Sequence, residues 1–235
     1  MVTDAFQGAA GTGQPPAGYP VLIIDDHELF STSLTMALRG HGFDAHQIPV
    51  ARLADFVRQA SNGPTGLVVL DLDLGRDTEG RWVHGADLVG SLRERGWQVL
   101  VVSGSVDQPG VAAAIAGGAI GSVPKSSSFD TLVRTVGMAA EGEPIMTETE
   151  RYHWLARHRS YQAKEIELAR RLDRLSTRER EVLELLAEGH RAGVIAERFV
   201  VSMATVRTQI RAILIKLEVN SQLEAVALVR QSPTR

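Results

Sequence analysis

Five side chains that can bind a metal ion or a phosphoryl group follow short apolar runs in the first part of the sequence. They are Asp25, Asp26, Asp71, Ser103 and Lys125. Three carboxylates brought together repel each other, and a hard, oxygen-seeking cation such as Mg²⁺ relieves this while leaving room for water and phosphate. A hydroxyl and an ammonium group suit the oxygens of a phosphorylated aspartate. The pattern predicts phosphoryl chemistry with Asp71 as the nucleophile.

The apolar runs that precede these side chains alternate with helix-length stretches from residue 19 to about residue 142. The expected strands are Val21–Ile24, Ala45–Ile48, Leu67–Leu70, Val99–Val102 and Ile120–Val123. Such alternation predicts an α/β fold, a five-stranded parallel sheet with helices on both faces. In strand order 2-1-3-4-5, the carboxyl ends of strands one and three are neighbours, which is where such sheets bind ligands. We therefore expect the acidic side chains to converge there.

Four segments around these strand ends resemble the receiver domain of response regulators. They are Val21–His27, Val68–Leu74, Val101–Gly104 and Gly118–Lys125. The resemblance covers residues 20 to about 142 and implies a doubly wound, flavodoxin-like domain. It also implies that a sensor histidine kinase phosphorylates Asp71 in the presence of Mg²⁺.

The same resemblance assigns a role to each residue of the motif. Mg²⁺ is held directly by Asp26 and Asp71, through water by Asp25, and by the carbonyl of Asp73. The residues that contact the phosphoryl group are Ser103 and Lys125.

Three positions depart from the receiver pattern. Gly75 replaces the usual proline, and residues 76–84 lengthen the loop after the acceptor by roughly six residues relative to the family. Ser122 stands where the family usually has an aromatic ring that moves with the switch hydroxyl. The loop could alter access to Asp71, and the serine could alter how the domain reports its state.

A charged stretch without Gly or Pro, Thr147–Leu175, predicts one long helix. Its residues with spacing 4, 3, 4, 3, 4, 3 are Trp154, His158, Tyr161, Glu165, Leu168, Leu172 and Leu175. This is a heptad seam, although three of its positions are polar or amphipathic. The helix is either a dimeric coiled coil, which would make the protein a homodimer, or a linker that packs within one chain.

A small helical domain is expected after this linker. Ser176–Glu179 forms a capping-box pattern at the start of a first helix, which ends at Gly189. Further helical patterns follow at about residues 191–198, 203–216 and 221–230. Four short helices in about 60 residues predict a compact bundle.

Three segments of this domain resemble the LuxR-type helix-turn-helix of the NarL/FixJ class: Leu175–Leu183, Ile195–Phe199 and Ser202–Ile210, followed by Lys216 and Leu217. The class binds DNA, and a helix with a basic face suits the major groove. By resemblance, base edges are reached by Arg207, Thr208 and Arg211, and backbone phosphates by Thr205 and Lys216. Gln209, at a position often occupied by histidine, and residues 192–194 depart from the family pattern.

Composition fits this organisation. Residues 1–146 carry 9 Lys and Arg against 16 Asp and Glu, whereas residues 174–235 carry 10 against 7, which suits an acidic site followed by a DNA-binding domain. There is no cysteine and no apolar run of membrane-spanning length. We expect a soluble cytoplasmic protein with a disordered tail at 1–19, a receiver at 20–142, a helical linker at 143–174 and a DNA-binding domain at 175–235.

Two alternatives to a phosphorylation-controlled, non-enzymatic regulator of transcription stay open. In the first, the receiver fold controls DNA binding without phosphorylation, in response to a ligand or partner. In the second, Asp71 and Asp73 belong to an aspartate-nucleophile phosphatase of the haloacid dehalogenase type. Such phosphatases place further metal-binding acids after the lysine, and the segment Ser126–Asp130 offers none.

Overall fold

The computed structural model describes residues 18–53, 56, 66–77, 79–104 and 108–231. Contacts divide the chain after residue 158 into two compact parts, here called unit 1 and unit 2, and each is described by itself. The expected N-terminal tail up to residue 17 and most of the helix expected between the second and third strands lie outside the described residues. No helix among the described residues combines the length and the apolar character needed to cross a membrane.

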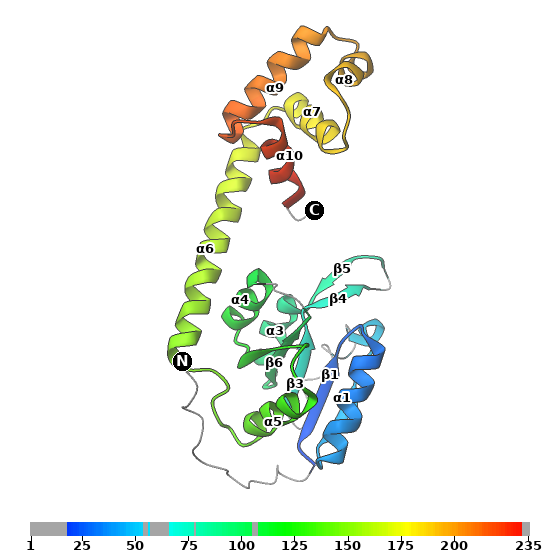
Figure 1. Ribbon diagram of the computed structural model, residues 1–235, viewed down its shortest axis with the longest axis vertical. Helices are drawn as coiled ribbons and strands as arrows, with labels where there is room; N and C mark the ends of the chain where they lie inside the picture. The colour runs from blue at the N-terminus through cyan, green and yellow to red at the C-terminus, as the bar shows by residue number, and fades with distance from the viewer. Residues whose placement is uncertain (1–17, 54–55, 57–65, 78, 105–107, 232–235) are drawn as a thin grey trace, which may run out of the picture. The chain divides into compact units, whose positions relative to one another are not determined.

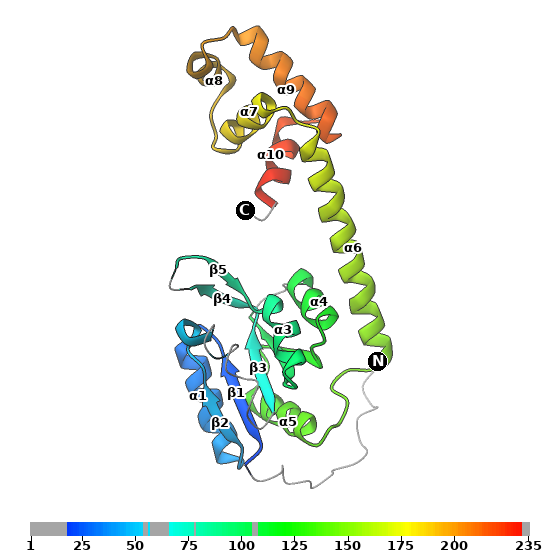
Figure 2. The same cartoon turned by 180° about the vertical axis from the view of Figure 1, so that it is seen from behind.

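Unit 1 contains the predicted five-stranded parallel sheet (Figures 1 and 2). Its strands, in the order β2-β1-β3-β6-β7, are β2 (Asp44–Gln47), β1 (Pro20–Ile24), β3 (Leu67–Asp71), β6 (Gln98–Ser103) and β7 (Gly121–Pro124). All neighbouring pairs are parallel. Both the sheet and the strand order expected from the sequence are confirmed.

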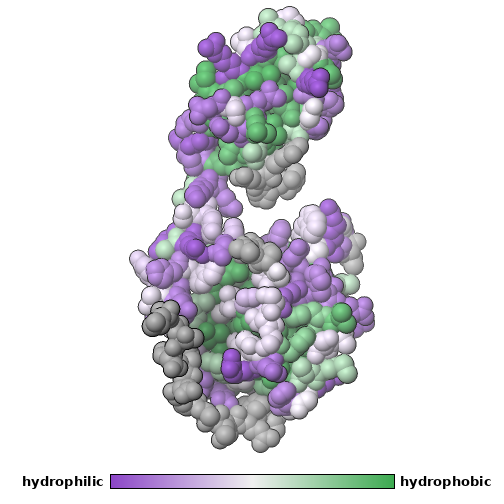
Figure 3. All heavy atoms as spheres, in the orientation of Figure 1, coloured by the Kyte–Doolittle hydropathy of each residue, from purple (hydrophilic) through white to green (hydrophobic). Residues whose placement is uncertain are grey.

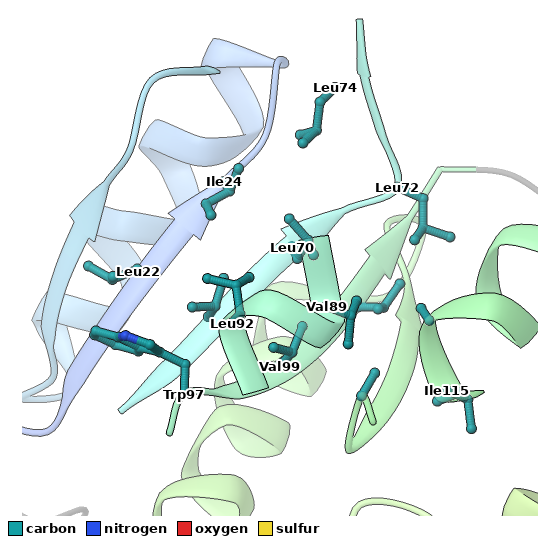
Figure 4. Packing of buried hydrophobic residues seen from close by; sticks show 14 of the residues in the cluster. Leu22, Ile24, Leu70, Leu72, Leu74, Val89, Leu92, Trp97, Val99 and Ile115 are labelled. Atoms are coloured by element: carbon teal, nitrogen blue, oxygen red, sulfur yellow. The ribbon is translucent and has the colours of Figure 1, made fainter. Parts of the chain in front are cut away.

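Helices cover both faces of this sheet, as a parallel sheet requires. On one face, α1 (Glu28–Gly40) and α5 (Phe129–Ala140) contact each other and bury the core that includes Leu34, Leu38 and Leu132. On the other face lie α3 (Gly85–Glu94) and α4 (Gln108–Ala116). Figure 4 shows Val89 and Leu92 of α3 over this second face.

Some apolar residues of α1 stay outside the core. Leu29 and Met36 are exposed, and the space-filling view shows apolar residues gathered over this helix (Figure 3). The core-facing residues of α1, Leu34 and Leu38, are fully buried. The helix therefore carries apolar side chains on more than the stripe that the sheet covers.

The lengthened segment after Asp71 forms a two-stranded antiparallel hairpin, which the sequence did not predict. It consists of β4 (Asp73–Arg76) and β5 (Trp82–His84). The Asp77 carboxylate accepts hydrogen bonds from the backbone amides of Glu79 and Arg81, each at 2.9 Å. Asp favours turns because its side chain can bond to the following backbone in this way. The turn thus fixes a segment that was expected to be only a longer loop.

The long linker helix is confirmed as α6 (Glu148–Asp173), and no residue of it is buried. Near its start, Trp154 packs against the core of unit 1 and Arg151 donates a hydrogen bond to the Ala119 carbonyl at 3.0 Å. Near its end, Leu172 packs against the core of unit 2. Leu175, the last seam residue, is buried in the same core. Three seam residues therefore pack within the chain, whereas Glu165 is exposed. Pairing of two copies through the seam stays a prediction.

Unit 2 is a compact bundle of four helices, as expected. The helices are α7 (Thr177–Ala187), α8 (Ala192–Phe199), α9 (Met203–Leu217) and α10 (Gln222–Gln231). The capping box is confirmed because Ser176 accepts from the Glu179 amide and the Glu179 carboxylate accepts from the Ser176 amide. The core of the bundle includes Val182, Leu186 and Ile213.

Candidate functional site

The acidic side chains come together at the carboxyl ends of β1 and β3. Asp25 and Asp26 directly follow β1, Asp71 is the last residue of β3, and these two strands pair in parallel. Oxygens of all three residues and a ring nitrogen of His27 lie within 4.8 Å of one another. The structure therefore brings together the three carboxylates that the strand order placed at one edge.

Lys125, which follows β7, is the counter-charge of this cluster. Its Nζ atom lies 2.7 Å from Oδ2 of Asp71 and 2.7 Å from Oδ2 of Asp25. Its backbone amide donates to the carbonyl of Ser103 at 2.8 Å. Nζ also lies 5.2 Å from the centre of the Phe30 ring. The backbone bond to β6 and the two carboxylates together fix the ammonium group above the acceptor.

Burial and charge set the proton affinities of this pair. Asp71 is only 3% exposed, and burial raises the pKa of its carboxyl, while the hydrogen bond from Lys125 opposes the rise and the charge of Asp25 adds to it. Burial lowers the pKa of Lys125, but its bonds to Asp25 and Asp71 outweigh this and leave that pKa raised. The ionised Asp71 is thus poorly stabilised and gains from a nearby cation.

Two further predicted residues, Asp73 and Ser103, lie near Asp71. The backbone amide of Asp73 donates to the Asp71 carboxylate, which lowers the pKa of Asp71, and the Asp73 side chain accepts from the Gly75 amide at 3.3 Å. Ser103 is buried at the end of β6, the strand that pairs with β3. The predicted roles of the Asp73 carbonyl at a metal and of the Ser103 hydroxyl at a phosphoryl group stay predictions.

His27 belongs to the cluster, although the sequence analysis assigned it no role. Its Nδ1 atom lies 2.6 Å from Asp26 Oδ1, 3.3 Å from Asp25 Oδ1 and 4.0 Å from Asp71 Oδ2. It is also the N-cap residue of α1, yet its side chain makes no capping bond. Its position directly after two aspartates was the available signal. Its ring is exposed and contacts the carboxylates of Asp25 and Asp26.

Gly85 is a second residue that the sequence analysis missed. It begins α3, and its backbone amide donates to the Leu72 carbonyl at 2.8 Å. A Cβ atom at this position would overlap the backbone carbonyl oxygen of Asp71. Glycine therefore allows α3 to start against the residue that carries the acceptor carboxylate.

The donor set of the cluster fits a hard divalent cation. Carboxylate oxygens are the ligands that Mg²⁺ prefers, and the oxygens of Asp25, Asp26 and Asp71 are close enough to share one ion. The single ammonium of Lys125 cannot balance three carboxylates. These residues could therefore hold a cation together with the oxygens of a phosphoryl group.

The expected DNA-binding face lies on α9 in unit 2. Ser202 accepts from the Thr205 amide at 3.1 Å and caps the helix, as predicted. Arg207 and Arg211 are exposed, and neither makes an ion pair with any residue that the structure describes. Thr208 is also exposed, and its hydroxyl donates to the Ala204 carbonyl one turn earlier. α9 therefore presents two free guanidinium groups to solvent.

Two other polar residues of α9 are turned toward the bundle. Nζ of Lys216 lies 2.6 Å from the carboxylate of Glu179, the buried capping-box residue of α7, and this bond helps to lower the pKa of Glu179 despite its burial. The amide oxygen of Gln209 is buried without a hydrogen-bond partner among the described residues. Lys216 thus ties α9 to α7, and its contact with a DNA phosphate stays a prediction.

Two family models match the chain. The response regulator receiver domain matches residues 21–137, and the luxR family of bacterial regulatory proteins matches residues 173–229. Together they cover both units and include every residue of the two sites.

Similar proteins match this chain over most of its length and most of their own. The nitrate/nitrite response regulator protein NarL of Escherichia coli K12 is 29% identical over 94% of this chain and 98% of its own. The transcriptional regulatory protein DegU of Brevibacillus brevis is 27% identical over 88% of this chain and 90% of its own. Among solved structures, full-length FixJ from B. japonicum is 23% identical over 92% of this chain and 98% of its own, with a TM-score of 0.45.

Proposed function

Because the chain belongs to the response regulators that join a receiver domain to a LuxR-family DNA-binding domain, we propose that phosphorylation of Asp71 controls DNA binding by α9. The observation that carries this proposal is the meeting of Asp25, Asp26 and Asp71 around the ammonium of Lys125. The protein is accordingly a regulator of transcription. Its site of action is the bacterial cytoplasm, which contains the DNA.

The chemistry at Asp71 is a phosphoryl transfer. An oxygen of its carboxylate forms a bond to the phosphorus of the donor, while the bond from phosphorus to the leaving atom breaks and the leaving group keeps the electron pair. Lys125 then exchanges its bond to Asp71 Oδ2 for one to a phosphoryl oxygen. Asp25, Asp26 and Asp71 would hold Mg²⁺, which would supply positive charge that offsets the charge of the transferring group. The donor that we propose is the phosphohistidine of a sensor kinase.

The product changes the charge of the site. A phosphoryl group adds close to two negative charges at the end of β3. Such a change shifts the populations of conformations that differ in their contacts with the phosphoryl oxygens. We propose that the favoured conformation of unit 1 alters the availability of α9 in unit 2 to DNA, as a monomer or as a homodimer.

Intact-mass measurement tests the first step. The full chain is incubated with Mg²⁺ and acetyl phosphate, and we expect a mass gain of one phosphoryl group. Asp71→Asn removes the nucleophilic oxygen and should abolish the gain. A wild-type protein that gains no phosphoryl group would favour the alternative, a receiver fold that regulates DNA binding without phosphorylation.

The DNA-binding face is tested with a duplex selected from a random library by the wild-type protein. Arg207→Ala and Arg211→Ala should each weaken binding by about 1–3 kcal/mol, the usual value of a good arginine-base contact. Arg170→Ala is the control, because Arg170 is paired with Glu167 on α6. Equal affinity of all four proteins would exclude α9 as the element that reads the duplex.

A further inference from the structure

A cavity of about 530 Å³ opens beside the acidic cluster. Its lining includes Asp25, Asp26 and Glu28 together with Gly75 and Arg76 of the hairpin. Asp71 does not line this cavity, but its carboxylate lies within 4.8 Å of those of Asp25 and Asp26, which do. These carboxylates repel anions, and a phosphodonor that approaches Asp71 is an anion. Arg76 is the single basic residue among the described residues that line the cavity.

The hairpin brings Arg76 to this place through Gly75. Gly75 has a φ of +67°, a conformation that glycine adopts without strain, and a Cβ there would lie 3.3 Å from Oδ2 of Asp26. The backbone of β4 therefore runs directly against one of the cluster's carboxylates, and Arg76 is the next residue. Glycine in place of the family's usual proline therefore puts a basic residue on the lining of the cavity, next in the chain to the residue that contacts Asp26.

Two contacts hold the Arg76 side chain in place. Its guanidinium carbon lies 4.7 Å from the centre of the Trp82 ring across the hairpin. Its Nη1 atom donates to the Gly80 carbonyl at 2.6 Å. Neither partner is an anion, and Arg76 makes no ion pair with any described residue. Its charge is therefore positioned without being neutralised.

Arg81 on the same hairpin shows the opposite arrangement. Its guanidinium lies 2.9 Å from Asp77 and 2.9 Å from Glu79, so two carboxylates balance its charge. Arg81 does not line the cavity. Among the described residues, the hairpin thus carries one arginine whose charge is balanced by carboxylates and one, on the lining of the cavity, whose charge is not.

We propose that Arg76 binds the phosphoryl oxygens of the incoming donor and offsets the repulsion by the carboxylates of the cavity, a role that rests on the proposed phosphorylation of Asp71. The planar guanidinium matches phosphoryl oxygens in geometry as well as charge. Trp82 is the positioning residue that holds the guanidinium. The donor chemistry is shared by a free acyl phosphate and by a phosphorylated imidazole, which the kinase would present.

The test compares phosphorylation rates of full-length variants with Mg²⁺ and either acetyl phosphate or phosphoimidazole, followed by intact mass. At low salt, Arg76→Gln should lower the second-order rate constant by about 3- to 10-fold, the low end of electrostatic steering. Arg76→Lys should restore part of the loss, and Trp82→Ala should give a smaller loss. High salt should bring Arg76→Gln and wild type together, since it screens exposed charges.

Arg81→Gln is the matched control and should keep the wild-type rate. A loss with acetyl phosphate alone would assign the contact to free acyl phosphates, and a loss with phosphoimidazole alone to phosphohistidine-like donors. Equal rates for Arg76→Gln and wild type at low salt, or a loss that persists at high salt, would overturn the role of Arg76. A wild-type protein that gains no phosphoryl group would overturn the proposed function and this inference together.

Discussion

The ionised carboxylate of Asp71 lowers the stability of the folded protein, and the direction of this effect can be tested. Its folded-state pKa is raised, first by burial, so the ionised form is disfavoured in the folded protein. A group of this kind stabilises the fold below its unfolded pKa and loses that contribution as pH rises through the folded value. At neutral pH without a metal ion, Asp71 therefore opposes folding.

Replacing this carboxylate by a neutral amide should stabilise unit 1. For Asp71→Asn at neutral pH without divalent cations, we expect a higher melting temperature. The gain should shrink as pH falls through the raised pKa and vanish below the ordinary value of 3.8. Millimolar Mg²⁺ should also shrink it, because the cation stabilises only the carboxylate. A gain that is constant with pH would contradict the burial of an ionised Asp71.

Gly85 begins α3 against the backbone of Asp71. Comparing substitutions at Gly85 and at Gly90 of the same helix separates this close approach from helix propensity. Gly85→Ala places a Cβ against the Asp71 carbonyl, so it should destabilise unit 1 by about 1–3 kcal/mol and slow phosphorylation. Gly90→Ala on the same helix meets nothing and should be neutral or stabilising by up to about 1 kcal/mol. Urea unfolding and intact mass would measure both effects. Equal behaviour of the two variants would contradict the close approach.

Among the elements, the turn between α8 and α9 carries a strained residue. Val200 ends α8 with a φ of 53°, and it is 90% exposed. A left-handed conformation costs an L-residue roughly 1–2 kcal/mol, and more for a β-branched one, and the side chain buries almost nothing in return. Val200→Gly should therefore stabilise unit 2 by about 1 kcal/mol. Thermal unfolding would show it, whereas Val201→Gly should destabilise because Val201 packs against the core.

Strands and helices that bury apolar runs could be predicted from the sequence, because burial imposes a pattern on the residues. The five strands of the sheet and α7 to α9 agree with their expected ranges to within two residues. The hairpin of β4 and β5 could not, because its strands are four and three residues long and half-exposed. What defines it is local, namely the Asp77 turn and the positive φ of Gly75 and Gly80.

The same limit applies to the site. Asp25, Asp26, Asp71 and Lys125 converge as the strand order required, because each follows a predictable strand. Arg76 could not be placed in this way, since its position depends on the unpredicted hairpin. Its charge is significant only because carboxylates line the same cavity.

For the chain as a whole, α6 is a continuous helix with contacts in both units. In unit 1, Arg157 donates to the side chain of Gln108, at the start of α4 and five residues after Ser103, and its guanidinium lies 5.4 Å from the Trp154 ring centre. In unit 2, Arg171 of α6 pairs at 3.2 Å with Glu218, the C-cap residue of α9. The helix thus contacts α4 in unit 1 and the C-cap residue of α9 in unit 2. Through these contacts, a change in unit 1 can reach α9 without the aromatic ring that the family usually has at the position of Ser122.

Breaking α6 where it touches neither core should separate phosphorylation of unit 1 from its effect on DNA binding by unit 2. Ala163→Pro costs about 3 kcal/mol of helix stability, and no buried residue of α6 offsets that loss. We expect Asp71 to gain a phosphoryl group as in wild type, and DNA binding to stop responding to phosphorylation. Ala163→Gln keeps the helix and should keep the response, as measured by DNA affinity with and without acetyl phosphate. An undiminished response in Ala163→Pro would mean that the phosphorylated unit 1 acts on DNA binding without an intact linker helix.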